Sequence, residues 1–482
     1  MQLNSKSLVN QKLVVQPIFS CLLHKEVFMG PCRYGSEDQL TYEYDKKSSL
    51  ETLEIFKEDL AKYVDLDFVE IKEPLSFEWH EDFAIKDAPF EKIAESAPAA
   101  DIFLVSGTRL ISYVSSLIAK RLNKPIAFCP LSNSNYSRLG GIDATAYLKA
   151  LGYKEMYNAL NYTELNQFFR ALKVRKALSH TKAMYGLRNN VISFGAVSSF
   201  VDLNDFEKKL GMEVFHFSGP EFFKVMDELT VEEQAKAQQI ADDLANEAEA
   251  NHMPVKYYVN DVKFYLAVNK VMDHYDCNAF TLPCFEMCAT KELNKRKLTF
   301  CLTHSLLKDE GVPSACASDV NSLACYQILM NLAKKCPTMG NCMVRVKDLE
   351  NNTMRILHDV PGRYMKGYDR EPEKVSYASF TMNSWGTTMR LDYAKDIGKK
   401  ITLINLSPRL DKIMIAKGEI IGCDDFVTPE CRLACVFKVK DAKAFHEKEE
   451  DFGHHYCWVY GDYTEDLEKV AKVLHMQAVL AE

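Results

Sequence analysis

The chain has 482 residues, of which 47% are hydrophobic and 26% are charged, and its formal net charge is −8. This length exceeds what a single hydrophobic core usually accommodates, so we expect two to four domains. A mildly acidic chain has no electrostatic attraction for nucleic acid or for an anionic membrane surface. Since no apolar run reaches about 18 residues and the N-terminus lacks the pattern of a signal peptide, we expect a cytoplasmic protein without a membrane span.

The 15 cysteines lie mostly inside apolar runs. In a long chain without a secretion signal, buried and reduced thiols are the expected state. Two pairs, Cys284 with Cys288 and Cys431 with Cys435, have the spacing C-x3-C. Structural zinc sites usually combine two C-x2-C pairs, so this spacing argues against a zinc site.

In the first third of the chain, segments with strand character alternate with segments of helical periodicity. We expect strands at 13–15, 101–107 and 125–129, and helices at 49–64 and 110–122. This alternation predicts a parallel sheet with helices on both faces.

A break in the pattern is expected at Gly140 and Gly141, before further helical stretches. A second α/β unit then begins near residue 185, with a strand expected at 190–196. Thr230 and Glu233 have the spacing of a capping box, which predicts the start of an acidic helix.

From about residue 342 the pattern changes to short alternating runs separated by turn signals, and it ends in a helix expected at 464–476. The sequence therefore predicts an α/β fold in three parts. Two Rossmann-like parallel-sheet domains are expected at 1–180 and 181–341. A mostly antiparallel β-domain with a final helix is expected at 342–482.

Two carboxylates follow predicted strands of the second sheet. Glu286 comes after the strand expected at 277–282, and Asp319 comes after the strand expected at 312–316. Ligands of open parallel sheets bind at the carboxyl ends of the strands, so both side chains are candidates for binding or proton transfer. The structural alternatives are a surface role for Glu286 and helix capping for Asp319.

Three histidines are candidates in the C-terminal part. His454 and His455 lie between a glycine and an aromatic, β-prone run, which places at least one imidazole at the mouth of a strand. His358 follows another predicted strand of the same domain. We expect these imidazoles to meet Asp319 across a shared crevice, although the histidine pair can also serve simply to begin its strand.

Five short segments occur in order along the C-terminal half, namely ACASDVN at 315–321, MGN at 339–341, LHD at 357–359, GHH at 453–455 and YGD at 460–462. Together they resemble the L-fucose isomerase and L-arabinose isomerase superfamily. The resemblance covers most of the chain at a coarse level and is sharpest from about residue 311 to the end. It implies aldose–ketose interconversion through an enediol stabilised by Mn²⁺ or another divalent metal. It also implies a homo-oligomer, either a trimer or a hexamer.

The chain departs from this family at the metal-binding carboxylates. The family has a glutamate two residues before the position of Asp319, where this chain has Ala317. The second family carboxylate falls near Gly340 and Asn341, and an asparagine cannot act as an anionic ligand or base.

The resemblance therefore implies an altered site. Its metal ligands would be His358, His455 and Asp319, and Asp319 or Glu286 would act as the acid or base. The expected substrate contacts are Asn341, Trp385 and Trp458. The two indole rings are candidates because they can stack on a sugar ring, and the alternative is that they belong to the core.

Two functions of different classes remain open. The first is a sugar isomerase-like enzyme that acts on a sugar or a sugar-like substrate with a relocated metal site. The second is a diverged relative without isomerase activity, which either performs a different, metal-independent reaction or serves as a carbohydrate-binding or partner subunit. Neither function involves nucleic acid or a membrane.

Overall fold

A computed structural model describes residues 3–23, 41–80, 88–132, 135–187, 200–284, 287 and 291–481. The chain forms two compact units, an N-terminal unit of residues 11–173 and a larger unit of residues 1–10 with 174–482. The division of the larger unit into domains at 181–341 and 342–482 stays a prediction. The strand expected at 190–196 and the candidate Glu286 lie outside the described residues.

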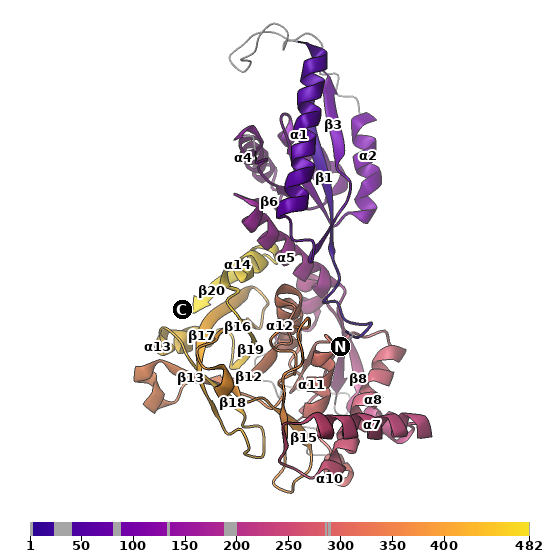
Figure 1. Ribbon diagram of the computed structural model, residues 1–482, viewed down its shortest axis with the longest axis vertical. Coiled ribbons are helices and arrows are strands. Elements are labelled where there is room, and N and C mark those ends of the chain that lie inside the picture. The colour runs from indigo at the N-terminus through magenta and orange to yellow at the C-terminus, as the bar shows by residue number, and fades with distance from the viewer. Residues whose placement is uncertain are drawn as a thin grey trace. The chain divides into compact units, whose positions relative to one another are not determined.

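The N-terminal unit is a parallel sheet with helices packed around it (Figure 1). The strand order is β2–β1–β4–β5–β6, and β3 pairs with the later part of β1. Strand β4 is buried along its whole length, as expected of a central parallel strand. The strands are β1 (Leu13–Leu23), β2 (Val69–Ile71), β3 (Leu75–His80), β4 (Ile102–Gly107), β5 (Ile126–Phe128) and β6 (Met156–Asn158). The helices are α1 (Tyr42–Tyr63), α2 (Ala88–Ser96), α3 (Ile111–Leu117), α4 (Asn135–Ala150) and α5 (Tyr162–Ser179), and the division between the units falls within α5.

The break expected at Gly140 and Gly141 is wrong, because helix α4 continues through both residues. A Cβ atom at Gly140 would lie 2.7 Å from Cδ1 of Ile111, and one at Gly141 would lie 3.2 Å from Cβ of Phe128. Close packing therefore explains the two glycines. A glycine inside a helix costs about 1 kcal/mol relative to alanine, which tertiary contacts of this kind can offset.

The larger unit begins with a second parallel sheet, in the order β11–β10–β7–β8. The predicted capping box is confirmed: Thr230 and Glu233 exchange side-chain and backbone hydrogen bonds at the start of α7. The strands are β7 (Lys182–Leu187), β8 (Glu213–Ser218), β10 (Ala279–Thr281) and β11 (Ser314–Ala315). The helices are α6 (Gly219–Asp227), α7 (Val231–Glu247), α8 (Tyr258–His274), α10 (Glu292–Arg296), α11 (Cys301–Asp309) and α12 (Val320–Ala333).

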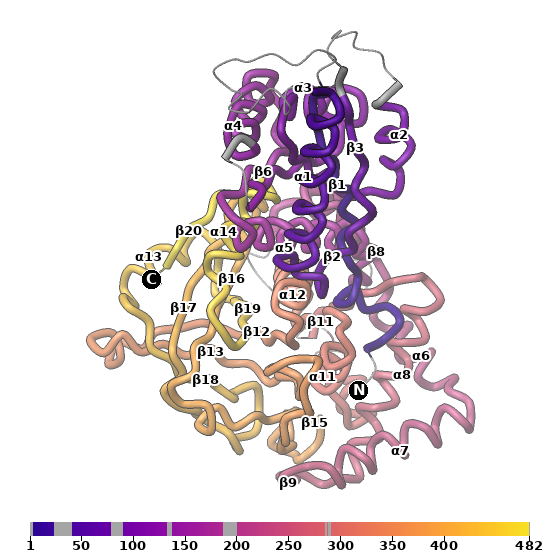
Figure 2. Tube along the Cα trace, turned by 45° about the horizontal axis from the view of Figure 1, so that its top comes forward, coloured from indigo at the N-terminus to yellow at the C-terminus, as the bar shows by residue number. Residues whose placement is uncertain are grey.

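The C-terminal part of this unit is a closed antiparallel barrel, drawn in orange and yellow in Figure 2. Within the described residues, the ring runs β16–β19–β12–β13–β18–β17 and closes where β17 pairs with β16. The barrel strands are β12 (Thr338–Met343), β13 (Thr353–Leu357), β16 (Lys400–Leu406), β17 (Lys412–Asp424), β18 (Ala434–Lys438) and β19 (His455–Tyr460). The predicted mostly antiparallel arrangement is thus confirmed.

Four further strands and two helices belong to the larger unit. Strand β20 pairs in parallel with β17, outside the ring. Strands β14 and β15 pair with each other, and β14 also pairs with β9. The bounds are β9 (Ala250–Asn251), β14 (Ser376–Ser379), β15 (Thr387–Arg390) and β20 (Gln477–Ala481), with helices α13 (Ala442–Glu449) and α14 (Thr464–Val473).

Helix α12 connects the second parallel sheet to the barrel. It contacts β10 and β11 on one side and β16 and β19 on another. Residues 320–332 are all buried, so the helix is covered on every side, as its apolar sequence requires. Its N-terminus is therefore fixed at the junction of the sheet and the barrel.

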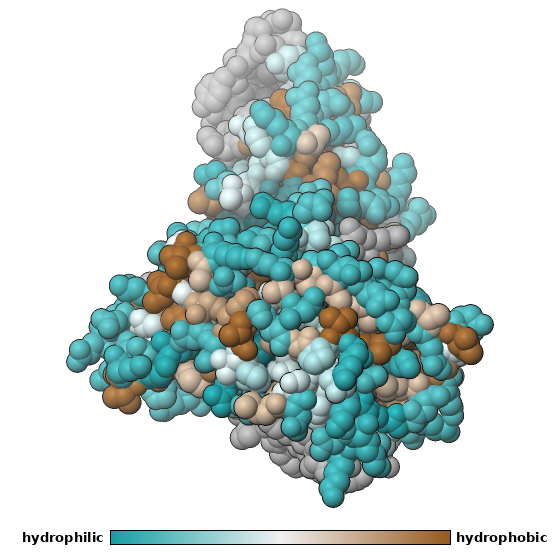
Figure 3. Space-filling model, turned by 60° about the horizontal axis from the view of Figure 1, so that its bottom comes forward, coloured by the Kyte–Doolittle hydropathy of each residue, from teal (hydrophilic) through white to brown (hydrophobic). Residues whose placement is uncertain are grey.

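None of the helices among the described residues is both long and apolar enough to cross a bilayer. Figure 3 shows one face of the molecule, which is mainly hydrophilic with separate apolar patches. Such patches are ordinary on folded proteins. The cysteines within the described ranges are free thiols, and most of them are buried, as the composition predicts.

Candidate active site

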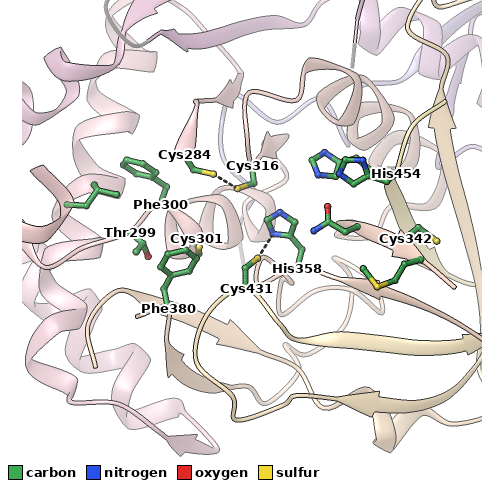
Figure 4. Close-up of a pocket in the computed structure, with 14 residues that line it drawn as sticks. Cys284, Thr299, Phe300, Cys301, Cys316, Cys342, His358, Phe380, Cys431 and His454 are labelled. Carbon is green, nitrogen blue, oxygen red and sulfur yellow. Dashed lines mark hydrogen bonds between the residues drawn. The ribbon is translucent and has the colours of Figure 1, made fainter. Parts of the chain in front are cut away.

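A cavity of about 640 Å³ lies in the larger unit, within the size range of small-molecule sites. Its polar lining consists of three histidines, several cysteines, Asn341 and Thr299, and the rest is mainly apolar. Figure 4 shows His358 near the middle of the lining, with Cys284 and Cys316 on one side of it and His454 and Cys342 on the other.

Asp319 and His455 form the central polar contact of the site. Asp319 is the N-cap of α12 and is 1% exposed. Its Oδ1 accepts a hydrogen bond from the backbone N–H of Ser322 at 3.0 Å, and its Oδ2 accepts one from the Ser322 hydroxyl at 2.7 Å. The Nδ1 of His455, at the start of β19, lies 2.8 Å from the same Oδ2.

This contact assigns the tautomer of His455. The carboxylate of Asp319 is an acceptor, so Nδ1 carries the proton and Nε2 remains as the basic nitrogen. The capping alternative for Asp319 is also correct, since one carboxylate caps the helix and orients the imidazole. The expected meeting of His455 with Asp319 is found, whereas their chemical roles stay predictions.

A strained turn places Asp319. Ala317 and Ser318, between β11 and α12, both have left-handed backbones, with φ of 60° and 58°. Each such residue costs about 1–3 kcal/mol when it is not glycine. The backbone N–H of Ser318 donates to the carbonyl of Leu282 after β10 at 2.9 Å, which helps to hold the turn.

The register of the barrel gathers the remaining polar side chains. On β12, Asn341 pairs with His455 of β19 on one side and with Leu357 of β13 on the other. His358 follows Leu357, so these groups share one end of the barrel. The ring centroids of His358 and His455 are 6.2 Å apart, and those of His454 and His455 are 4.5 Å apart.

Burial keeps several of these groups uncharged. It lowers the pKa of His358 to about 3, with the neighbouring His455 as a smaller cause. Burial likewise lowers the pKa of His454 and raises the pKa of Cys301 and Cys431 well above the usual thiol value. The Nδ1 of His358 lies 3.2 Å from Sγ of Cys431, and both partners are neutral near pH 7.

Two thiols lie at the carboxyl ends of adjacent parallel strands. Cys284 follows β10 and Cys316 follows β11, and their Sγ atoms are 3.4 Å apart (Figure 4). Cysteines inside apolar runs resemble core residues, so the sequence alone does not single these two out. Cys284 comes just after one expected strand and Cys316 is the last residue of another, and the same closeness to a strand end made Asp319 a candidate.

The other predicted residues are placed as follows. Asn341 and His358 line the cavity. Trp458 is 1% exposed and packs against Tyr393, with ring centroids 5.5 Å apart. Trp385 is also buried in the core of the larger unit, and neither indole is part of the cavity lining. A stacking role for these two rings therefore gains no support.

The donors present do not suit Mn²⁺. Within the described ranges, no group of three or more histidine, cysteine, aspartate or glutamate residues is arranged to hold a metal ion. The oxygens of Asp319 already accept hydrogen bonds from Ser322 and His455. Thiols dominate the rest of the donor set, whereas Mn²⁺ prefers carboxylate, carbonyl and water oxygens. We therefore derive no reaction step through a metal.

A scan against protein-family models and a search of curated proteins found no match to this chain.

Proposed function

We propose that the cavity is the active site of an isomerase-like enzyme that interconverts an aldose and a ketose, or sugar-like compounds of the same type. The hydrogen bond between Asp319 and His455 at the cavity carries this proposal. Interconversion of a hydroxyaldehyde and a hydroxyketone requires a base that removes a proton from one carbon and returns it to the next. A histidine oriented by a buried carboxylate is such a base.

The proposed reaction uses the residues as follows. Nε2 of His455 removes the proton from the carbon that bears the hydroxyl group next to the carbonyl. Asp319 stabilises the resulting imidazolium through Nδ1–H, as a carboxylate does in a catalytic triad. The amide N–H of Asn341 donates a hydrogen bond to the developing enediolate oxygen. His455 then returns the proton to the former carbonyl carbon, and a hydroxyl proton moves between the two oxygens.

The neutral state of His358 favours this cycle. An imidazolium at His358, with its ring centroid 6.2 Å from that of His455, would disfavour protonation of His455. Because burial lowers the pKa of His358 to about 3, this repulsion is absent near pH 7.

The test is a panel of aldoses and ketoses incubated with the purified full-length protein, with product formation followed by chromatography. His455→Asn should lower kcat/KM by about 100-fold or more, because it removes the general base. Asp319→Asn should lower kcat more than it raises KM. His446→Asn, on the exposed side of α13, is the matched control and should leave turnover unchanged. Equal turnover by the wild type and His455→Asn would refute the proposed role of His455.

The second candidate is a diverged protein that binds a ligand, or supports a partner, without isomerising it. The preponderance of thiol and apolar groups in the cavity lining favours it, because a sugar requires many hydrogen-bonding partners. Under this alternative, no panel member is converted, and a bound compound raises the melting temperature of the protein.

We further propose that the chain contains two Rossmann-like domains and assembles into a trimer or hexamer, as the resemblance implies. Light scattering on the purified protein tests the assembly. A monomer mass would contradict it.

A further inference from the structure

The wall of the cavity contains a pair of sulfur atoms in direct contact. Cys316 directly follows β11 and Cys284 lies three residues after the end of β10, and these two strands are hydrogen-bonded parallel neighbours. Their Sγ atoms are 3.4 Å apart. A disulfide bond is about 2.05 Å long, so the two atoms need to approach by roughly 1.4 Å, which small side-chain rotations can supply.

The two thiols are not equivalent. The Sγ–H of Cys316 donates to Sγ of Cys284, and this hydrogen bond is the first cause that raises the pKa of Cys316, followed by burial. Cys316 is 3% exposed, whereas Cys284 is half-buried. A thiolate on Cys284 would accept the hydrogen bond from Cys316. Cys284 is therefore the sulfur that a small oxidant in the cavity can reach first.

The other thiols nearby that fall within the described residues are placed differently. Sγ of Cys431 contacts His358, and burial raises the pKa of Cys301. Cys325 and Cys457 also interact with each other, but each is 1% exposed and neither lines the cavity. Proximity and access to the cavity thus coincide at Cys284 and Cys316.

We propose that Cys284 and Cys316 are a redox-active pair that a hydroperoxide converts into a reversible disulfide in the cavity wall. The Cys284 thiol gives up its proton and the thiolate attacks the peroxide oxygen. The O–O bond breaks, the departing oxygen takes up a proton and leaves as water or an alcohol, and a sulfenic acid remains on Cys284. The Cys316 sulfur then attacks that sulfur, the S–S bond forms, and the departing hydroxyl leaves as water with the proton of the Cys316 thiol. Two electrons pass from the thiols to the peroxide, and an external dithiol reverses the change by exchange.

The disulfide would change the cavity directly. It would join the carboxyl ends of β10 and β11 and remove two thiol groups from the lining. The turn that carries Asp319 begins immediately after Cys316, so oxidation reaches the candidate site through the backbone. The proposal concerns covalent chemistry and does not depend on the isomerase activity.

The test treats the purified full-length protein with hydrogen peroxide, blocks the remaining thiols with iodoacetamide after unfolding, and maps linked peptides by mass spectrometry. The expected product joins Cys284 to Cys316 and disappears after dithiothreitol. In Cys316→Ser, Cys284 should remain a sulfenic acid that dimedone traps. Cys423→Ser, which replaces another half-buried thiol on β17, is the matched control and should still form the Cys284–Cys316 linkage.

Two outcomes would overturn the proposal. One is alkylation of both thiols after peroxide treatment, and the other is a disulfide from Cys284 to Cys288 or Cys431 in place of Cys316. The wild-type result does not require any variant to fold. The product is a disulfide bond that is detected without any activity assay. A protein that forms this disulfide but converts no sugar would therefore refute only the proposed function.

Discussion

Replacement of Asp319 separates its helix-capping role from its histidine-orienting role. Asp319→Ala removes the N-cap of α12, at a cost of about 1 kcal/mol. It also leaves the buried Ser322 hydroxyl and the partly buried Nδ1 of His455 without their acceptor, and each such donor without a partner costs about 1 kcal/mol. The free energy of unfolding should therefore fall by about 3 kcal/mol.

Asp319→Asn is the matched variant. Asparagine caps helices about as well as aspartate, and its amide oxygen accepts one hydrogen bond in place of the charged oxygen. Its loss of stability should be about 1 kcal/mol, while the orientation and charge stabilisation of His455 are lost.

Urea unfolding of the full-length protein, followed by tryptophan fluorescence, measures both variants. Two of the three tryptophans, Trp385 and Trp458, are buried in the larger unit, so the signal reports mainly on the unit that contains Asp319. If Asp319→Ala were as stable as Asp319→Asn, the hydrogen bonds to Ser322 and His455 would not stabilise the fold as argued.

Three further predictions concern acid sensitivity, packing and metals. Burial lowers the pKa of His304 and of His358 from 6.5 to about 3. Between pH 3 and pH 6.5 the unfolded state therefore binds more protons than the folded state, so the free energy of unfolding decreases as the pH falls below 6.5. Each histidine should lower the free energy of unfolding by up to about 2 kcal/mol between pH 6.5 and pH 5. The urea midpoints measured at these two pH values should therefore differ less in His304→Gln than in the wild type. Gly107→Ala should destabilise the N-terminal unit by about 3 kcal/mol or more, because φ is +143° and the added Cβ collides with the backbone oxygen of Ser20. The loss should appear as faster proteolysis of residues 11–173 in the full chain. A proteolysis rate equal to that of the wild type would contradict this. The turnover of sugar by the protein should survive dialysis against EDTA and should not rise when MnCl₂ is added, because the side chains around the cavity do not suit Mn²⁺. Stoichiometric manganese in the purified protein would contradict this.

Several features could be predicted from the sequence because they depend on local patterns. The apolar run of β4 indicates a buried parallel strand, and the short alternating runs from about residue 342 onward indicate strands of a mostly antiparallel β-domain. The meeting of Asp319 with His455 was also predictable, since both residues lie at the ends of expected strands.

Other features depend on contacts between distant segments and leave no local pattern. The pairing that closes the barrel between β16 and β17 is one of them, and it does not follow from strand character alone. A buried Trp458 and a ligand-stacking tryptophan look alike in sequence, as do a core thiol and the cavity thiol of Cys316. Gly140 and Gly141 indicate a break locally, but tertiary packing makes them part of a helix.

Proton exchange with solvent tests the central claim most directly. The full-length protein is incubated in D₂O with each aldose and ketose of the panel, and NMR follows the hydrogen on the carbon next to the carbonyl. We predict that deuterium replaces this hydrogen in at least one compound with the wild type, and that His455→Asn slows the replacement by about 100-fold. Exchange at the wild-type rate in His455→Asn, or no exchange in any compound, would contradict a proton transfer carried out by His455 and Asp319.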